Sequence, residues 1–69
     1  MTSVIHGYAD GAASKPWRYD YDRLPAVHQI QYEIGRHVAA WARWAGFQPK
    51  PTDTTDVVLR RRDKYLRGE

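Results

Sequence analysis

Apolar residues recur at helical spacing along one stretch of the chain, residues 24–46. Their successive separations are three, four, four, three and four residues, which places the side chains on one face of an α-helix. The positions are Val27, Ile30, Ile34, Val38, Trp41 and Ala45, and His37, Ala42 and Trp44 widen this face. Gly46 suits the left-handed conformation at a helix C-terminus, and Phe47 is expected to fold back on the last turn, as in a Schellman ending. The pattern therefore predicts a long amphipathic helix that stops at Gly46.

A glycine interrupts this predicted helix at position 35. Glycine in a helix interior costs about 1 kcal/mol relative to alanine. Either the helix tolerates Gly35 at this cost, or the missing side chain lets another backbone approach closely beside Ile34 and Val38. The sequence leaves both interpretations open.

A second, shorter helix is predicted at residues 53–67. The connector before it, residues 47–52, contains two prolines in three residues and should be extended and stiff. Thr52 and Asp53 offer side-chain oxygens for capping the helix N-terminus, and Gly68 is expected to end the helix. Its apolar strip is narrow and consists of Val58, Leu59, Tyr65 and Leu66.

The segment before the long helix lacks a helical period and contains two glycines. Within it, the aromatic residues of segment 16–23 alternate with charged ones, so Trp17, Tyr19 and Tyr21 would share one side of an extended strand. This predicts an extended aromatic arm over residues 1–23. Its rings either cover the chain's own helix or dock on another protein by adding a strand to a sheet edge. Stacking on nucleic-acid bases is a third interpretation, which the interleaved aspartates disfavour.

Together these elements predict a small all-α fold, in which the extended arm precedes a two-helix unit over residues 24–69, arranged as a helical hairpin or an L-shape. The chain has 69 residues, which is at most one small domain, and its apolar stripe is wider than the remaining residues can cover. Another protein or a second copy of the chain is therefore expected to cover the rest. The residues expected to bind this partner are Trp17, Tyr19, Tyr21, Val27, Ile30, Ile34, Val38, Trp41 and Trp44.

The net charge of +3 is modest, but basic residues concentrate in the second predicted helix. They are Arg60, Arg61, Arg62, Lys64 and Arg67. This cluster is a solvated helix face, a contact for an acidic protein, or a set of phosphate contacts. A helix-turn-helix is disfavoured, because the six-residue connector with two prolines is longer than the turn of that motif. A small DNA- or RNA-binding regulator is therefore the second choice of function.

Sites for catalysis, metals or cofactors are not expected. The chain has no cysteine, and His6, His28 and His37 lack partners at metal-ligand spacing. No phosphate-binding loop, serine elbow or pair of carboxylates is present, and a chain this short has little room for a substrate pocket. No apolar run is long enough to span a membrane, and the first residues do not resemble a signal peptide. A cytoplasmic or virion-associated location is expected, and not secretion.

The expected function is that of a non-enzymatic subunit that docks on a larger assembly or associates with itself. Tyr, Trp and Arg are enriched in binding hot spots, and this short chain carries three Trp and five Tyr. A short, arginine-rich chain without disulfides is compatible with a bacteriophage component, such as an accessory particle protein or an inhibitor of a host protein.

Overall fold

Three α-helices build the fold in the computed structural model, which describes residues 3–18 and 20–68. They are α1 (Ser3–Ala12), α2 (Ala26–Trp44) and α3 (Thr55–Arg67), with a short 3₁₀ turn, η1 (Tyr21–Arg23), before α2. No strand occurs in these described ranges. The prediction of a small all-α fold is confirmed, and the helices predicted at 24–46 and 53–67 differ from α2 and α3 by at most two residues at either end.

The N-terminal segment is not the extended arm that the sequence predicted, because α1 occupies its first half. A helix of this length is marginal in isolation, so packing must hold it, and Val4 and Tyr8 are buried in the core. The strand expected over residues 16–23 is also wrong. Trp17 lies in irregular structure and Tyr21 begins the 3₁₀ turn, whereas Tyr19 lies outside the described residues.

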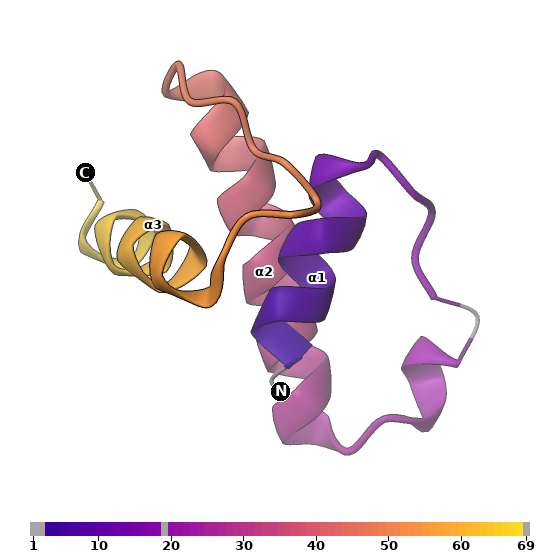
Figure 1. Ribbon diagram of the computed structural model, residues 1–69. Coiled ribbons are helices and arrows are strands. Elements are labelled where there is room, and N and C mark those ends of the chain that lie inside the picture. The colour runs from indigo at the N-terminus through magenta and orange to yellow at the C-terminus, as the bar shows by residue number, and fades with distance from the viewer. Residues whose placement is uncertain (1–2, 19, 69) are drawn as a thin grey trace.

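Helices α1 and α2 lie side by side and run in the same direction (Figure 1). The long connection between them returns along the pair, so that both helices start at the same end. Ser3 Oγ is 3.1 Å from Nδ1 of His28, near the start of each helix. One and two turns further along, Gly7 faces Tyr32 and Gly11 faces Arg36. In each of these three pairs the residue of α2 comes 25 positions after the residue of α1, which defines the register of the two parallel helices.

Glycines allow the two backbones to touch. A Cβ atom added to Gly7 would lie 2.0 Å from the carbonyl oxygen of Tyr32, and one added to Gly35 would lie 2.1 Å from the carbonyl oxygen of Val4. Neither position has room for a side chain, because even a Cβ atom would overlap the backbone of the facing helix. The close-approach interpretation of Gly35 is therefore confirmed, with α1 as the approaching element.

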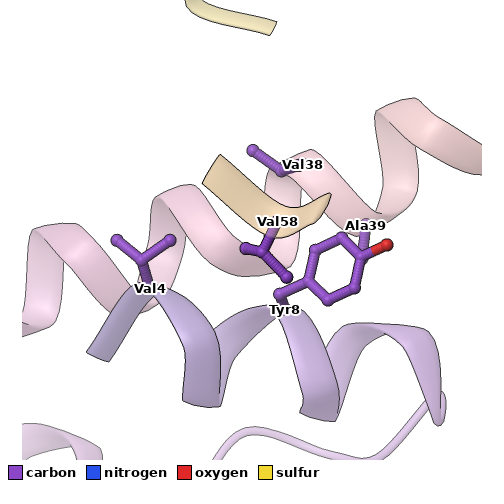
Figure 2. Packing of buried hydrophobic residues seen from close by; sticks show 5 residues of the cluster. All are labelled: Val4, Tyr8, Val38, Ala39 and Val58. Atoms are coloured by element: carbon purple, nitrogen blue, oxygen red, sulfur yellow. The ribbon is translucent and has the colours of Figure 1, made fainter. Parts of the chain in front are cut away.

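Helix α3 lies across the α1–α2 pair and inserts Val58 between them (Figures 1 and 2). In Figure 2 this side chain points towards Val4 and Tyr8 of α1. The buried cluster consists of Val4, Tyr8, Val38, Ala39 and Val58. Each helix contributes to it, so burial of apolar surface depends on all three being in place.

The buried face of α2 differs from the apolar stripe that the sequence indicated. Its buried residues are Tyr32, Gly35, Val38, Ala39 and Ala42, of which only Val38 and Ala42 belong to the predicted apolar face. Small residues face α1 because they permit the close approach, and Tyr32 can be buried because its hydroxyl finds a hydrogen-bond partner. Ile34 and Trp41 are half-buried, whereas Val27, Ile30 and Trp44 are exposed.

The predicted end of α2 is confirmed in detail. Gly46 has a φ of 96°, and the amide of Phe47 donates to the carbonyl oxygen of Ala42 at 2.8 Å, which is the Schellman pattern. The Phe47 ring folds back onto Trp41, with 5.8 Å between the ring centroids. At the start of α3, however, the expected capping is wrong. The N-cap residue is Thr54 and makes no side-chain cap bond, while Asp53 accepts a hydrogen bond from the amide of Lys50 at 3.0 Å.

Ser14 closes α1 in a conformation that favours glycine. Its φ is 56°, and the amide of Lys15 donates to the carbonyl oxygen of Asp10 at 2.9 Å, as in a Schellman ending. Because Ser14 is exposed, Ser14→Gly should relieve the left-handed strain and raise the free energy of unfolding by about 0.5–1 kcal/mol. Urea unfolding measures this, with Ser14→Ala as the control. Equal stability of the two variants would contradict the assigned backbone conformation.

Candidate functional site

Two networks of tyrosine, aspartate and arginine link the helices to the loops. In the first, the Tyr8 hydroxyl donates to Oδ2 of Asp53 at 2.6 Å, and Nη1 of Arg61 lies 3.0 Å from the same oxygen. Arg61 also donates to the Tyr8 hydroxyl. This network joins α1, the connector and α3, so it fixes the position of α3 on the helix pair.

The second network is built in the same way around Asp10, which is buried near the end of α1. The Tyr32 hydroxyl donates to Oδ2 of Asp10 at 2.6 Å, and Nε of Arg18 donates to it at 2.9 Å. It joins α1, α2 and the connection between them. Sequence patterns did not indicate either network, because each depends on residues that are brought together only by the tertiary fold.

Both carboxylates are held in the charged form. Burial by itself would raise the pKa of Asp53, but the hydrogen bonds from Tyr8 and Lys50 and the Arg61 charge outweigh it, and the pKa lies below its ordinary value. Burial would likewise raise the pKa of Asp10, and the hydrogen bonds from Tyr32 and Arg18 again lower it. The stability that each contributes is therefore present above the ordinary carboxyl pKa and is lost as the pH falls through the lowered value.

Tyr8 provides a prediction at alkaline pH. Burial, followed by the hydrogen bond to Asp53, raises the pKa of Tyr8 from 10.0 to about 12. The unfolded chain would release this proton first, so the free energy of unfolding should fall by about 2 kcal/mol as the pH rises from 10 to 12. Urea unfolding across this range measures the fall, which Tyr8→Phe should reduce. If the free energy of unfolding of Tyr8→Phe falls as much as that of the wild type over this pH range, the Tyr8 hydroxyl is not buried and hydrogen-bonded as described.

The basic cluster of α3 is divided by the fold. Arg61 is largely buried and forms an ion pair with Asp53, and Nη2 of Arg62 lies 3.7 Å from Oδ1 of Asp63. Arg60 and Lys64 are exposed and line a shallow hollow with Phe47, Val57 and Arg61. Arg67 is exposed in the last turn. Arg61 and Arg62 are therefore engaged with carboxylates of the chain, whereas Arg60, Lys64 and Arg67, at positions i, i+4 and i+7, lie on one exposed side of α3.

The aromatic residues of the connection cover α2 of the same chain. The rings of Trp17 and Tyr21 lie 5.0 Å apart, and both contact the ring of Tyr32, at 5.4 and 5.8 Å between centroids. The guanidinium of Arg36 lies 4.8 Å from the Trp17 ring centroid. These contacts support the interpretation that the rings pack on their own helix, although Trp17 stays partly exposed.

Large apolar side chains remain exposed near both ends of α2 and in the last turn of α3. Val27 and Ile30, in the first turns of α2, are 57% and 56% exposed. Trp44 in the last turn of α2 is 82% exposed, and Leu66 in the last turn of α3 is 60% exposed. Val38 at the centre is fully buried, so it contributes to the core in this conformation.

A second hollow, of about 350 Å³, lies between the connection and the exposed side of α2. It is lined by Gly11, Ser14, Trp17, Arg36, His37, Ala40 and Arg43, which we call the basic hollow. Arg36 donates to the carbonyl oxygen of Lys15 at 2.8 Å, and Arg43 donates to that of Gly11 at 3.3 Å. Backbone carbonyls thus hold both guanidinium groups in place without neutralising them.

In comparisons with known proteins, no protein-family model, no curated protein and no solved structure matches the chain. In the described ranges, no group of three or more His, Asp or Glu residues is placed to hold a metal ion. Of the helices in these ranges, none combines the length and the hydrophobicity needed to cross a bilayer.

Proposed function

We propose that this chain is a non-enzymatic interaction subunit, which docks on a larger assembly or associates with a second copy of itself. The exposure of Trp44 carries the proposal, because an indole placed in water on a well-formed helix gains from burial against another surface. The exposed side chains of Leu66, Val27 and Ile30 support it, since each adds apolar area that the three helices leave uncovered.

Nucleic-acid binding through α3 remains the second candidate. Arg60 and Lys64 are exposed and have no ion-pair partner among the described carboxylates. Arg61, at the centre of the cluster, is bound to Asp53 and Tyr8 and is therefore less available to phosphate. A role in a bacteriophage particle, or as an inhibitor of a host protein, stays a prediction from the composition of the chain.

Two measurements test the proposal. Sedimentation equilibrium over a wide concentration range gives the mass of the purified chain. Purification from the cells that produce the chain shows whether a partner accompanies it in a stoichiometric amount. We expect either a self-associated species or a defined complex. Trp44→Ala should weaken it at least about tenfold, as removal of a hot-spot side chain does. Gln48→Ala, an exposed polar position just beyond the helix, is the control and should have little effect.

A chain that stays monomeric at every concentration and co-purifies with no stoichiometric partner would contradict the proposal. So would a complex in which Trp44→Ala and Gln48→Ala behave alike. Binding to DNA that falls steeply with salt and is abolished by replacing Arg60 and Lys64 with Ala would favour the second candidate instead.

A further inference from the structure

We propose that the basic hollow binds a carboxylate-rich segment of the partner protein. This inference rests on the proposed interaction function and adds to it the chemistry of the partner. The two guanidinium groups of Arg36 and Arg43, at one side of α2, would pair with acidic side chains, while Trp44 would contact an apolar residue next to them.

The positions of the two arginines suit such a segment. Arg36 and Arg43 are seven residues apart on α2, so they lie on one side of the helix, roughly 10 Å apart along its axis. Acidic residues seven apart in a helix have the same separation and also share one side of that helix. A guanidinium has five N–H donors, and the bonds to backbone carbonyls use only part of them, which leaves donors for a carboxylate.

The charge of the hollow selects an anionic occupant. No acidic side chain is among its described lining residues, and neither Arg36 nor Arg43 forms an ion pair with a described carboxylate. Because the guanidinium groups are already held by carbonyls, binding an anion requires little further ordering of these side chains.

An apolar anchor lies beside these charges. His37 lines the hollow, and Trp44, seven residues later, lies on the same side of α2. A segment that places carboxylates against Arg36 and Arg43 therefore brings its neighbouring residues to the exposed indole of Trp44.

The surroundings favour a protein segment over a nucleic acid. Beyond Trp17 the neighbouring hollow is lined by Arg18, which is paired with Asp10, and by Asp22 and Glu33, so the positive surface is short. A nucleic-acid backbone carries charge at every step and would meet these carboxylates, whereas a peptide can be neutral there. The Trp17 ring is also covered by the Arg36 guanidinium, at 4.8 Å from its centroid, which hinders stacking of a base.

The test uses a short fluorescent peptide of glutamates around two central leucines, a matched peptide with glutamine in place of glutamate, and oligothymidylate of equal charge. Fluorescence anisotropy measures the affinity of the whole chain for each. We expect the glutamate peptide to bind more tightly than the other two. The double variant R36Q/R43Q should weaken this binding about tenfold, since it removes two charge-assisted contacts.

The matched control is R60Q/K64Q, which removes the same charge from the other hollow and should change the affinity less than about twofold. Arg36 also packs on Trp17, so the double variant can lower the melting temperature of the chain. In that case R43Q alone replaces it in the test and should weaken binding about threefold. Arg43→Lys keeps the charge and should retain most of the affinity.

Three results would overturn the inference: equal binding of the glutamate and glutamine peptides, equal weakening by the two double variants, or tighter binding of oligothymidylate through Arg36 and Arg43. The last would assign the hollow to nucleic acid. If the natural complex requires Trp44 but is unaffected by R36Q/R43Q, this inference fails and the proposed interaction function stands.

Discussion

Replacing Gly35 with alanine is expected to lower the free energy of unfolding by about 3 kcal/mol, a large part of the stability of a chain this small. The new Cβ would lie 2.1 Å from the carbonyl oxygen of Val4 and 2.6 Å from the amide nitrogen of Tyr8. Both are backbone atoms, so α1 must move away, and Val58 would lose its contacts with Val4 and Tyr8. Urea unfolding followed by far-UV circular dichroism measures the loss.

A graded comparison separates this clash from the general effect of alanine, which by itself stabilises a helix by about 1 kcal/mol relative to glycine. Gly7→Ala should resemble Gly35→Ala, because its Cβ would lie 2.0 Å from the carbonyl oxygen of Tyr32. Gly11→Ala should stay within about 1 kcal/mol of the wild type, since the closest atoms are 3.1–3.3 Å away and include the Ala39 methyl group. If Gly35→Ala proves as stable as Gly11→Ala, the helices do not touch at Gly35.

Replacing Asp53 with asparagine is expected to lower the free energy of unfolding by about 2–3 kcal/mol at neutral pH. Asparagine keeps the shape and can still accept the hydrogen bond from the Lys50 amide. It removes the negative charge that faces Arg61 and the strong acceptor of the Tyr8 hydroxyl, both of which are largely buried. Urea unfolding of the variant against the wild type gives the difference.

The pH dependence and a surface control make this prediction specific. The Asp53 pKa is lowered in the folded chain, so its stabilising effect is present above about pH 4 and is lost below it. The difference between Asp53→Asn and the wild type should therefore shrink as the pH falls below about 4. Asp63→Asn, at a more exposed pair with 3.7 Å between charged atoms, should cost less than about 0.5 kcal/mol. Equal losses in the two variants would contradict the role of Asp53.

The helices that the sequence predicted correctly are those whose signals are local. Helix α2 has a long apolar period, and Gly46 with Phe47 marks its end whatever packs around it. Helix α3 follows a stiff connector and ends at Gly68, which has a φ of 79°. Periodicity and helix-ending residues act within a few turns, and so they can be recognised without the tertiary structure.

Helix α1 could not be predicted in this way, because the residues that argue against a helix are those that its packing requires. Gly7 and Gly11 lower the intrinsic helix propensity, yet they form the surface that meets α2. The spacing of four between them, together with Gly35 and Ala39 in the other helix, was the available signal. The same reason explains why the buried face of α2 was misplaced towards its larger residues.

The residues that the sequence assigned to a partner stay a prediction. Trp44, which is one of them, is exposed. The basic hollow was not predicted, because the connection after α1 must fold back over α2 before Trp17 and Ser14 approach the two arginines. Arg36 and Arg43, spaced by seven residues on the polar side of a predicted helix, were the only local sign of it.

Fluorine NMR of the chain labelled with 5-fluorotryptophan, in H2O and in D2O, is the most direct test of whether Trp44 meets a partner. The three indoles are assigned by single Trp→Phe replacements. In the isolated monomer, Trp44 should show the full solvent isotope shift of an exposed ring, and half-buried Trp41 a smaller one. In the complex, or in the self-associated form, the Trp44 shift should largely disappear. A Trp44 signal that is shielded in the monomer, or that stays fully exposed in the complex, would contradict an interface at this residue.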